Sequence, residues 1–310
     1  MAKDPVLLSY LFLMLKPKSV QFETEIEEPT FLPDILRWKE FFQHAGGLGA
    51  QEQVAYVLQG VSWKNKIPDP IQAEIELIIV RQKLRFSILQ REIDWVLDLF
   101  NETKVSAIFT GSFDLGSRFY SNRLSRPLGD IELIILPNLT LLAKVALGKG
   151  NYRLKTEMGE GIFSRGLGAP NVALRNGFLF ESPNHEEELV FERAHVLGAP
   201  HVLKRISVLS PTDVFIDLIQ KGQNRATFKQ PIYLNDLHFV VSSNGVNWVE
   251  AERILKGNKL LSVADFALEM LTQNWGTQLP SEIQTQNRNW TNPIRRKLLF
   301  RGMKTRLELE

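Results

Sequence analysis

The chain has 310 residues, with 37 Lys and Arg against 35 Asp and Glu, so its formal net charge is only +2. This balance gives no general electrostatic basis for binding nucleic acid, although it does not exclude a local contact. The chain has no cysteine, which excludes disulfides, thiolate metal sites and a cysteine nucleophile, and its five histidines lack the spacing of zinc ligands. Any bound metal is therefore expected to have oxygen ligands.

The first hundred residues have a helical pattern that proline and glycine interrupt several times. The apolar run "VLLSYLFLML" is too short to span a bilayer and lacks the features of a signal peptide, so we expect a buried helix there and a cytoplasmic protein without a membrane partner. After Pro70, apolar residues recur at steps of mostly three and four, which predicts one long helix. This stripe consists of Ile75, Ile79, Phe86, Leu89, Ile93, Val96 and Phe100.

Two short apolar runs, Val105–Phe109 and Ile131–Leu136, predict buried strands. The segment Leu139–Leu147 predicts a helix, and the glycine-rich stretch that follows predicts a hairpin with a loop. In "EEELVFERAHVL" the alternation predicts a further strand, with Glu188 and Glu192 on one face.

The remainder of the chain is again helical in pattern. Ser210 is suited to cap a helix whose first residue is Pro211. We therefore predict an α+β fold in which a small mixed β-sheet in residues 105–209 is flanked by helical regions at 1–104 and 210–310.

Asp130 and Glu132 stand two residues apart at the start of the second predicted strand, so their side chains share one face. Burying an unpaired carboxylate is costly, and a divalent cation is one partner for such a pair. Gly111 and Ser112 follow the first strand, where backbone and hydroxyl donors can approach a phosphate. These are the parts that phosphoryl or nucleotidyl transfer requires. The alternative is an exposed strand end with both acids solvated.

The order of a strand, Gly-Ser and an acid-x-acid strand resembles the polymerase-β-like nucleotidyltransferase superfamily. From about residue 30 to 275 the chain resembles a bacterial family of uncharacterised nucleotidyltransferases. The best-defined element of this resemblance is "RPLGDIELII", which contains Arg126, Pro127, Asp130 and Glu132.

The resemblance implies a nucleotidyltransferase-type core and the metal-dependent transfer of a nucleotidyl group from an NTP to an acceptor, such as a small molecule, a peptide or another biosynthetic intermediate. It implies that Asp130, Glu132 and an acid on a later strand bind the metal and act in catalysis. We assign this third position to Glu192, with Glu188 as its substitute. Mg²⁺ is the expected ion, with Mn²⁺ as a replacement because it shares the preference for oxygen ligands.

The resemblance also implies that Gly111 and Ser112 bind the triphosphate. We add Arg118 and Arg126 as phosphate contacts because both lie in the loop between these elements, although either can equally be a plain surface charge.

Three features depart from the family pattern. Members tend to carry a histidine in the helix after "LSP", where this chain has only "QKGQNR". Thr110 stands where members usually carry lysine, and Glu132 stands where they usually carry aspartate. A catalytically silent protein of the same fold, acting as a nucleotide-sensing or partner-binding module, is therefore the alternative function. A transferase that modifies nucleic acid would copurify with RNA and depend strongly on salt, and the balanced net charge argues against it.

Overall fold

The computed structural model describes residues 34–156, 161–166, 168–178, 184–197, 206–224, 227–228 and 230–280, together with 11, 14–16, 26–28 and 283. The chain divides into two compact units, Met1–Ser210 and Pro211–Glu310. The predicted N-terminal helix lies mostly outside the described residues. The division into three regions that the sequence suggests stays a prediction.

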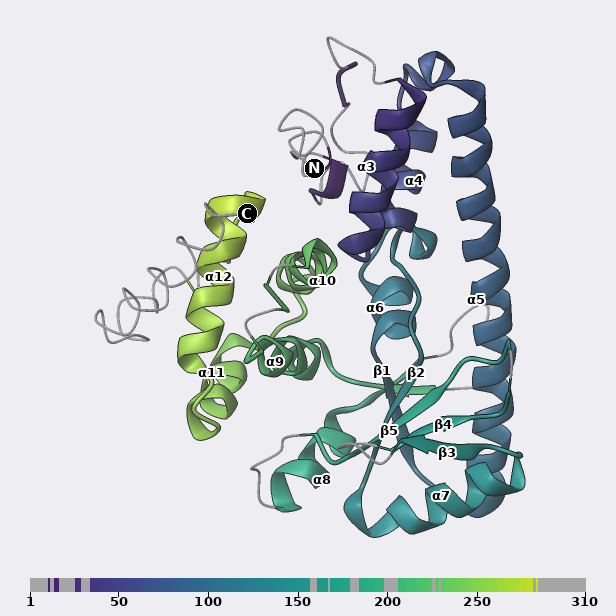
Figure 1. Ribbon diagram of the computed structural model, residues 1–310. Helices are drawn as coiled ribbons and strands as arrows, with labels where there is room; N and C mark the ends of the chain where they lie inside the picture. The colour runs from purple at the N-terminus through teal and green to yellow at the C-terminus, as the bar shows by residue number, and fades with distance from the viewer. Residues whose placement is uncertain are drawn as a thin grey trace. The chain divides into compact units, whose positions relative to one another are not determined.

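The helices of the first unit lead into the predicted long helix. Helix α3 spans Ile35–Gly47, α4 spans Gln51–Gly60, and α5 spans Asp69–Thr103 after a short 3-10 turn at Lys64–Lys66. The apolar stripe faces the core, which confirms the prediction for α5. In Figure 1, α5 runs from α3 and α4 at one end of this unit to the β-sheet at the other.

The described strands of the first unit form one seven-stranded sheet in the order β3-β4-β5-β2-β1-β7-β6. Strands β1 and β2 are antiparallel, whereas β2 is parallel to β5 and β1 is parallel to β7. The sheet is therefore mixed, and the predicted α+β class with helices before and after the sheet is confirmed. The strands are β1 (Ala107–Thr110), β2 (Ile131–Ile135), β3 (Arg153–Thr156), β4 (Ile162–Ser164), β5 (Val172–Asn176), β6 (His195–Leu197) and β7 (Ile206–Val208).

The two faces of β2 have different roles. Ile131, Leu133 and Ile135 belong to the buried cluster that the sheet forms with α5 and with α7 (Thr140–Lys149). Glu132 and Ile134 point to the opposite face because side chains alternate along a strand. The apolar core thus fixes the face on which the acid lies.

Short helices and 3-10 turns lie between several of the strands. Helix α6 (Ser112–Arg118) follows β1, and 3-10 turns occur at Arg123–Ser125 and Pro137–Leu139. The strand predicted around Glu188 and Glu192 is wrong, because these residues lie in helix α8 (Asn184–Arg193). Glu, Leu and Arg are strong helix formers, and an alternation over five residues is too short to outweigh that preference.

The second unit contains α9 (Pro211–Lys221), α10 (Pro231–Ser242), α11 (Trp248–Gly257) and α12 (Leu261–Trp275). Helix α9 begins at the predicted Pro211. Its Phe215 ring contacts the edge of Trp248 on α11, with ring centroids 5.1 Å apart. No helix in the described part of the chain is both long and apolar enough to cross a membrane.

A buried carboxylate joins α5 to the segments around β3 and β4. The Tyr152 hydroxyl donates to Glu92 Oε1 at 2.5 Å, and Arg165 Nη2 lies 2.5 Å from Glu92 Oε2. Burial, together with the hydrogen bond to Glu92, raises the pKa of Tyr152 well above its usual value, so the phenol stays protonated and can donate. This interaction holds the segment at Arg165 against the long helix.

We predict that Tyr152→Phe lowers the stability of the folded chain by about 1–3 kcal/mol, because it leaves one buried oxygen of Glu92 without its donor. The measurement is the urea midpoint of unfolding followed by circular dichroism. An unchanged midpoint would show that this hydrogen bond contributes nothing to stability.

Candidate active site

Gly111 and Glu132 meet at the end of strand β1. The register of β1 and β2 pairs Thr110 with Glu132, which brings the acid beside the turn into α6. Gly111 has φ +77° and ψ −150°, and a Cβ atom on it would overlap Oε1 of Glu132 and lie 2.6 Å from its carboxyl carbon. Residues with a side chain rarely adopt this backbone conformation. The space that the glycine leaves is therefore filled by the Glu132 carboxylate.

Ser112 fixes the loop that precedes the acids. Its buried hydroxyl oxygen accepts a hydrogen bond of 2.8 Å from the backbone N–H of Gly129. The hydroxyl can still donate its own hydrogen to another group. Ser112 thus ties the residue before Asp130 to the turn after β1, in addition to the phosphate-binding role predicted for it.

Asp130 is positioned by Asn171, the residue just before β5. The backbone N–H of Ile131 donates to the Asn171 carbonyl at 2.9 Å, and the Asn171 side-chain amide lies 3.2 Å from each oxygen of Asp130. Both side chains are partly exposed. The amide orients the carboxylate and leaves it accessible to a ligand.

Among the described residues, no third carboxylate is paired with Glu132 across β1 or β5. The residues paired with Glu132 are Thr110 on β1 and Ala173 on β5. Glu188 and Glu192 are exposed on helix α8. Within the described ranges no three acidic or histidine side chains are grouped closely enough to hold a metal ion.

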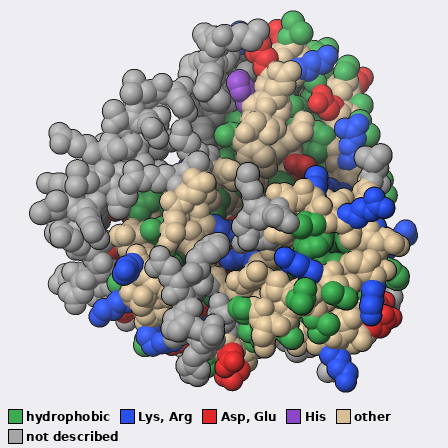
Figure 2. All heavy atoms as spheres, turned by 60° about the horizontal axis from the view of Figure 1, so that its bottom comes forward, with side chains coloured by type: hydrophobic (Ala, Val, Ile, Leu, Met, Phe, Trp, Pro, Cys, Tyr) green, Lys and Arg blue, Asp and Glu red, His purple; other side chains and the backbone are tan. Residues whose placement is uncertain are grey.

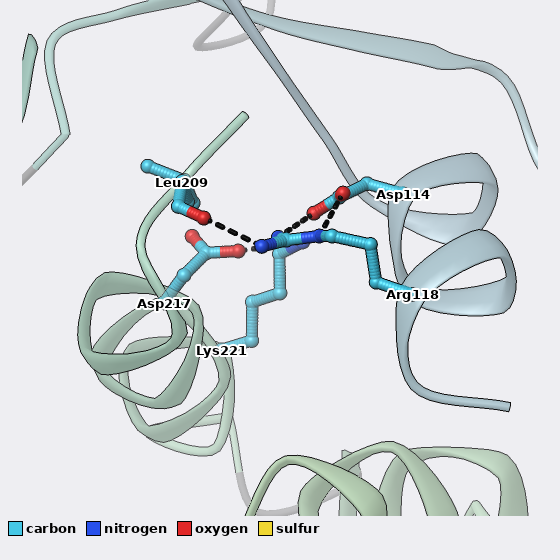
Figure 3. Close-up of polar contacts among 5 residues, drawn as sticks. All are labelled: Asp114, Arg118, Leu209, Asp217 and Lys221. Carbon is cyan, nitrogen blue, oxygen red and sulfur yellow. Dashed lines mark hydrogen bonds and ion pairs between the residues drawn. The ribbon is translucent and has the colours of Figure 1, made fainter. Parts of the chain in front are cut away.

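Arg118 has a different environment from the one we expected. Its guanidinium donates from Nε to Asp114 Oδ1 at 2.5 Å, pairs through Nη2 with Asp114 Oδ2, and donates from Nη1 to the Leu209 carbonyl at 2.8 Å (Figure 3). The Asp114 side chain is only 1% exposed. The charge of Arg118 is therefore used to neutralise a buried acid and to hold the end of the segment after β7.

Arg126 is held mainly through its backbone. Its carbonyl accepts a hydrogen bond of 2.8 Å from Gln82 of α5, and its Nη1 donates to the Pro127 carbonyl at 2.9 Å. The residue is only partly buried, so its role as a phosphate contact stays a prediction.

A cavity of about 360 Å³ opens beside Asp130, between α5 and the residues before β5. Its wall includes Arg81 and Arg85 of α5, together with Asp130 and Asn171. The sequence analysis did not identify the two arginines or Asn171. The two arginines could have been found from the sequence, because they are four residues apart and outside the apolar stripe. This spacing puts both on one face of the helix. In Figure 2, Lys and Arg side chains lie between hydrophobic ones over the right-hand part of the face shown.

The donor set fits one Mg²⁺ ion better than two. Mg²⁺ is usually held by one or two carboxylates together with substrate phosphates and water. Asp130, just before β2, and Glu132, in β2, stand two residues apart and are the two carboxylates available for such a pair. A two-metal arrangement needs a further acid, which the residues next to Glu132 on β1 and β5 do not provide.

The sequence matches no protein-family model, and it matches no curated protein. Among solved structures, the chain is similar to the antibiotic-resistance factor ANT(2'')-Ia, a nucleotidyltransferase, with 12% identity and a TM-score of 0.42. The match covers 57% of this chain and 91% of that protein. A likeness of this size assigns no activity to the chain.

We predict that Gly111→Ala costs about 1–3 kcal/mol of stability, because alanine is strained at this φ and its methyl group displaces the Glu132 carboxylate. Thermal unfolding measures this loss. The control is Gly148→Ala in α7, where a Cβ atom meets nothing within 4 Å and alanine should be neutral or stabilising. Equal unfolding temperatures for the two variants would contradict the contact.

We also predict that Arg118→Met destabilises the first unit by about 3–5 kcal/mol, because it removes the guanidinium that pairs with the buried Asp114. Lys66→Met is the control in the same unit, since Lys66 pairs with Glu28 at the surface. Breaking such an exposed pair should cost about 0–1 kcal/mol. Denaturant titration of both variants compares the two pairs, and similar losses would show that burial of Asp114 does not matter.

Proposed function

We propose that this chain is a metal-dependent nucleotidyltransferase whose reaction centre is the pair Asp130 and Glu132. The observation that supports this most directly is the packing of the Glu132 carboxylate against Gly111, which brings the acid-x-acid strand and the Gly-Ser turn together. The sequence analysis supports the same proposal, because a strand, the Gly-Ser turn and the acid-x-acid strand follow one another in the chain.

Asp130 and Glu132 would hold Mg²⁺, or Mn²⁺ in its place. The ion, when bound, supplies positive charge to the phosphate oxygens of the NTP. The other residues of the site hold these acids and the substrate in place. Asn171 orients Asp130, and the hydroxyl of Ser112 anchors Gly129. Arg126 is the proposed phosphate contact.

The proposed reaction moves a nucleotidyl group to an acceptor hydroxyl. The acceptor oxygen forms a bond to the α-phosphorus, and the bond from that phosphorus to the oxygen that bridges to the β-phosphate breaks. Pyrophosphate leaves with the electron pair of the broken bond. The hydroxyl proton passes to a carboxylate oxygen of Asp130 and from there to solvent, which is a general-base role suited to an acid that borders an open cavity.

A second candidate function is nucleotide binding without transfer. The strand neighbours of Glu132 favour this function. They are Thr110 on β1 and Ala173 on β5, and neither supplies a third acid for the metal. Both functions predict binding of a metal–NTP complex, and only the first predicts release of pyrophosphate when an acceptor is present.

We predict that Asp130→Asn weakens binding of Mg-NTP by at least about tenfold, or about 1.4 kcal/mol, because the amide preserves the shape of the side chain and removes its charge. Calorimetric titration of each Mg-NTP, repeated with Mn²⁺, measures the change. Glu102→Gln is the matched control, an exposed acid at the far end of α5, and it should bind as the wild-type protein does. Undiminished binding by Asp130→Asn would contradict the proposed site.

A further inference from the structure

We propose that the cavity beside Asp130 binds the acceptor, and that this acceptor is a small organic anion that carries a phosphate or carboxylate group as well as a hydroxyl. The inference deepens the proposed function and rests on it, since an acceptor is meaningful only if a nucleotidyl group is transferred. The three observations that carry the inference are the charge of the cavity, its mixed lining and its place next to Asp130.

The charge of the cavity comes from one face of α5. Arg81 and Arg85 are four residues apart, so they lie one above the other on the helix and both line the cavity. Within the described residues neither guanidinium takes part in a hydrogen bond or ion pair. Asp130 is the one acid among the described residues of the lining, and Asn171 already donates to it. Two cations without a partner among the described residues therefore line the cavity.

Guanidinium groups select a particular kind of ligand. Their planar forks match the oxygens of a carboxylate or a phosphate, with two parallel hydrogen bonds. Arg118 makes this arrangement within the protein, where both oxygens of Asp114 accept from it. Arg81 and Arg85 have the same chemistry available for a group that comes from outside.

The rest of the lining points to a ligand with a carbon skeleton. Leu84, which is 60% exposed, and Pro170 contribute apolar surface between the polar groups. The volume of about 360 Å³ is at the lower end of the range of about 300–1,000 Å³ that is typical of small-molecule sites. A small organic anion fits this combination better than a polymer or an inorganic ion.

The position of the cavity indicates that it binds the acceptor rather than the triphosphate. Gly129 and Asp130 line it, whereas Gly111, Ser112 and Glu132 do not. Asp130 thus borders the cavity and stands two residues before Glu132. An acceptor held by Arg81 and Arg85 can present its hydroxyl to Asp130, while the α-phosphorus approaches from the Gly-Ser side.

The test measures binding of glycerol 3-phosphate, glycerate and glycerol to the full chain in the presence of Mg²⁺ and α,β-methylene-ATP, which cannot undergo the transfer. Ligand-observed NMR gives the affinities. We expect one of the two anions to bind at least about tenfold more tightly than glycerol, or by about 1.4 kcal/mol, because glycerol lacks the charged group that the guanidiniums would bind. The phosphate and carboxylate probes show which anionic group the arginines select.

The variants Arg81→Gln and Arg85→Gln should each weaken the preferred anion by about tenfold and leave Mg-nucleotide binding unchanged. The matched control is Arg91→Gln, which removes an exposed arginine of the same helix outside the cavity lining and should change neither affinity.

Three results would overturn the inference, and each can be told from the others. If neither anion binds better than glycerol, the cavity does not select an anion. If the Arg81 and Arg85 variants weaken Mg-nucleotide as much as the anion, the arginines bind the triphosphate, and the proposed function stands without this acceptor. If the wild-type chain binds no Mg-nucleotide, the proposed function fails first and the acceptor role fails with it.

Discussion

The candidate site depends on a single packing constraint, the absence of a side chain at Gly111. The Glu132 carboxylate occupies the volume that a Cβ atom would fill, and the φ of +77° at Gly111 is one that residues with side chains rarely adopt. The apolar core sets the face of β2 on which Glu132 lies, and the missing Cβ atom at Gly111 lets the Glu132 carboxylate approach the turn after β1. The hydrogen bond from Gly129 to Ser112 then fixes the residue before Asp130.

The arginines of the first unit illustrate how environment decides the use of a charge. Arg118 contacts a nearly inaccessible aspartate and a backbone carbonyl, so its guanidinium is part of the fold. Arg81 and Arg85 line a cavity and have no such partners within the described residues. An arginine stabilises the fold where it neutralises a buried acid. It is suited to bind a ligand where it lines a cavity that has few other charges.

Much of the fold could be predicted from short-range patterns. The stripe along α5 predicted that helix because apolar residues at steps of three and four permit few alternatives, and the apolar run at Ile131 predicted β2 for a similar reason. The segment at Glu188 failed because its alternation was brief and its residues favour a helix.

The site could be predicted only in part, because cavities form between segments that are distant in sequence. Asp130 and Glu132 were recognisable from their spacing within one strand. Arg81, which is 49 positions before Asp130, lines the same cavity only because the fold brings α5 near the start of β2. The partner of Arg118 was also missed, although Asp114 is one helical turn away, since burial of the acid is a property of the folded chain.

Anomalous diffraction from crystals grown with Mn²⁺ and α,β-methylene-ATP is the most direct test of the carboxylate pair. We predict a manganese peak with oxygen ligands from Asp130 and Glu132 at about 2.1 Å, together with phosphate oxygens of the nucleotide. A nucleotide bound without metal at this pair, or manganese bound only elsewhere on the chain, would contradict the assignment of the reaction centre.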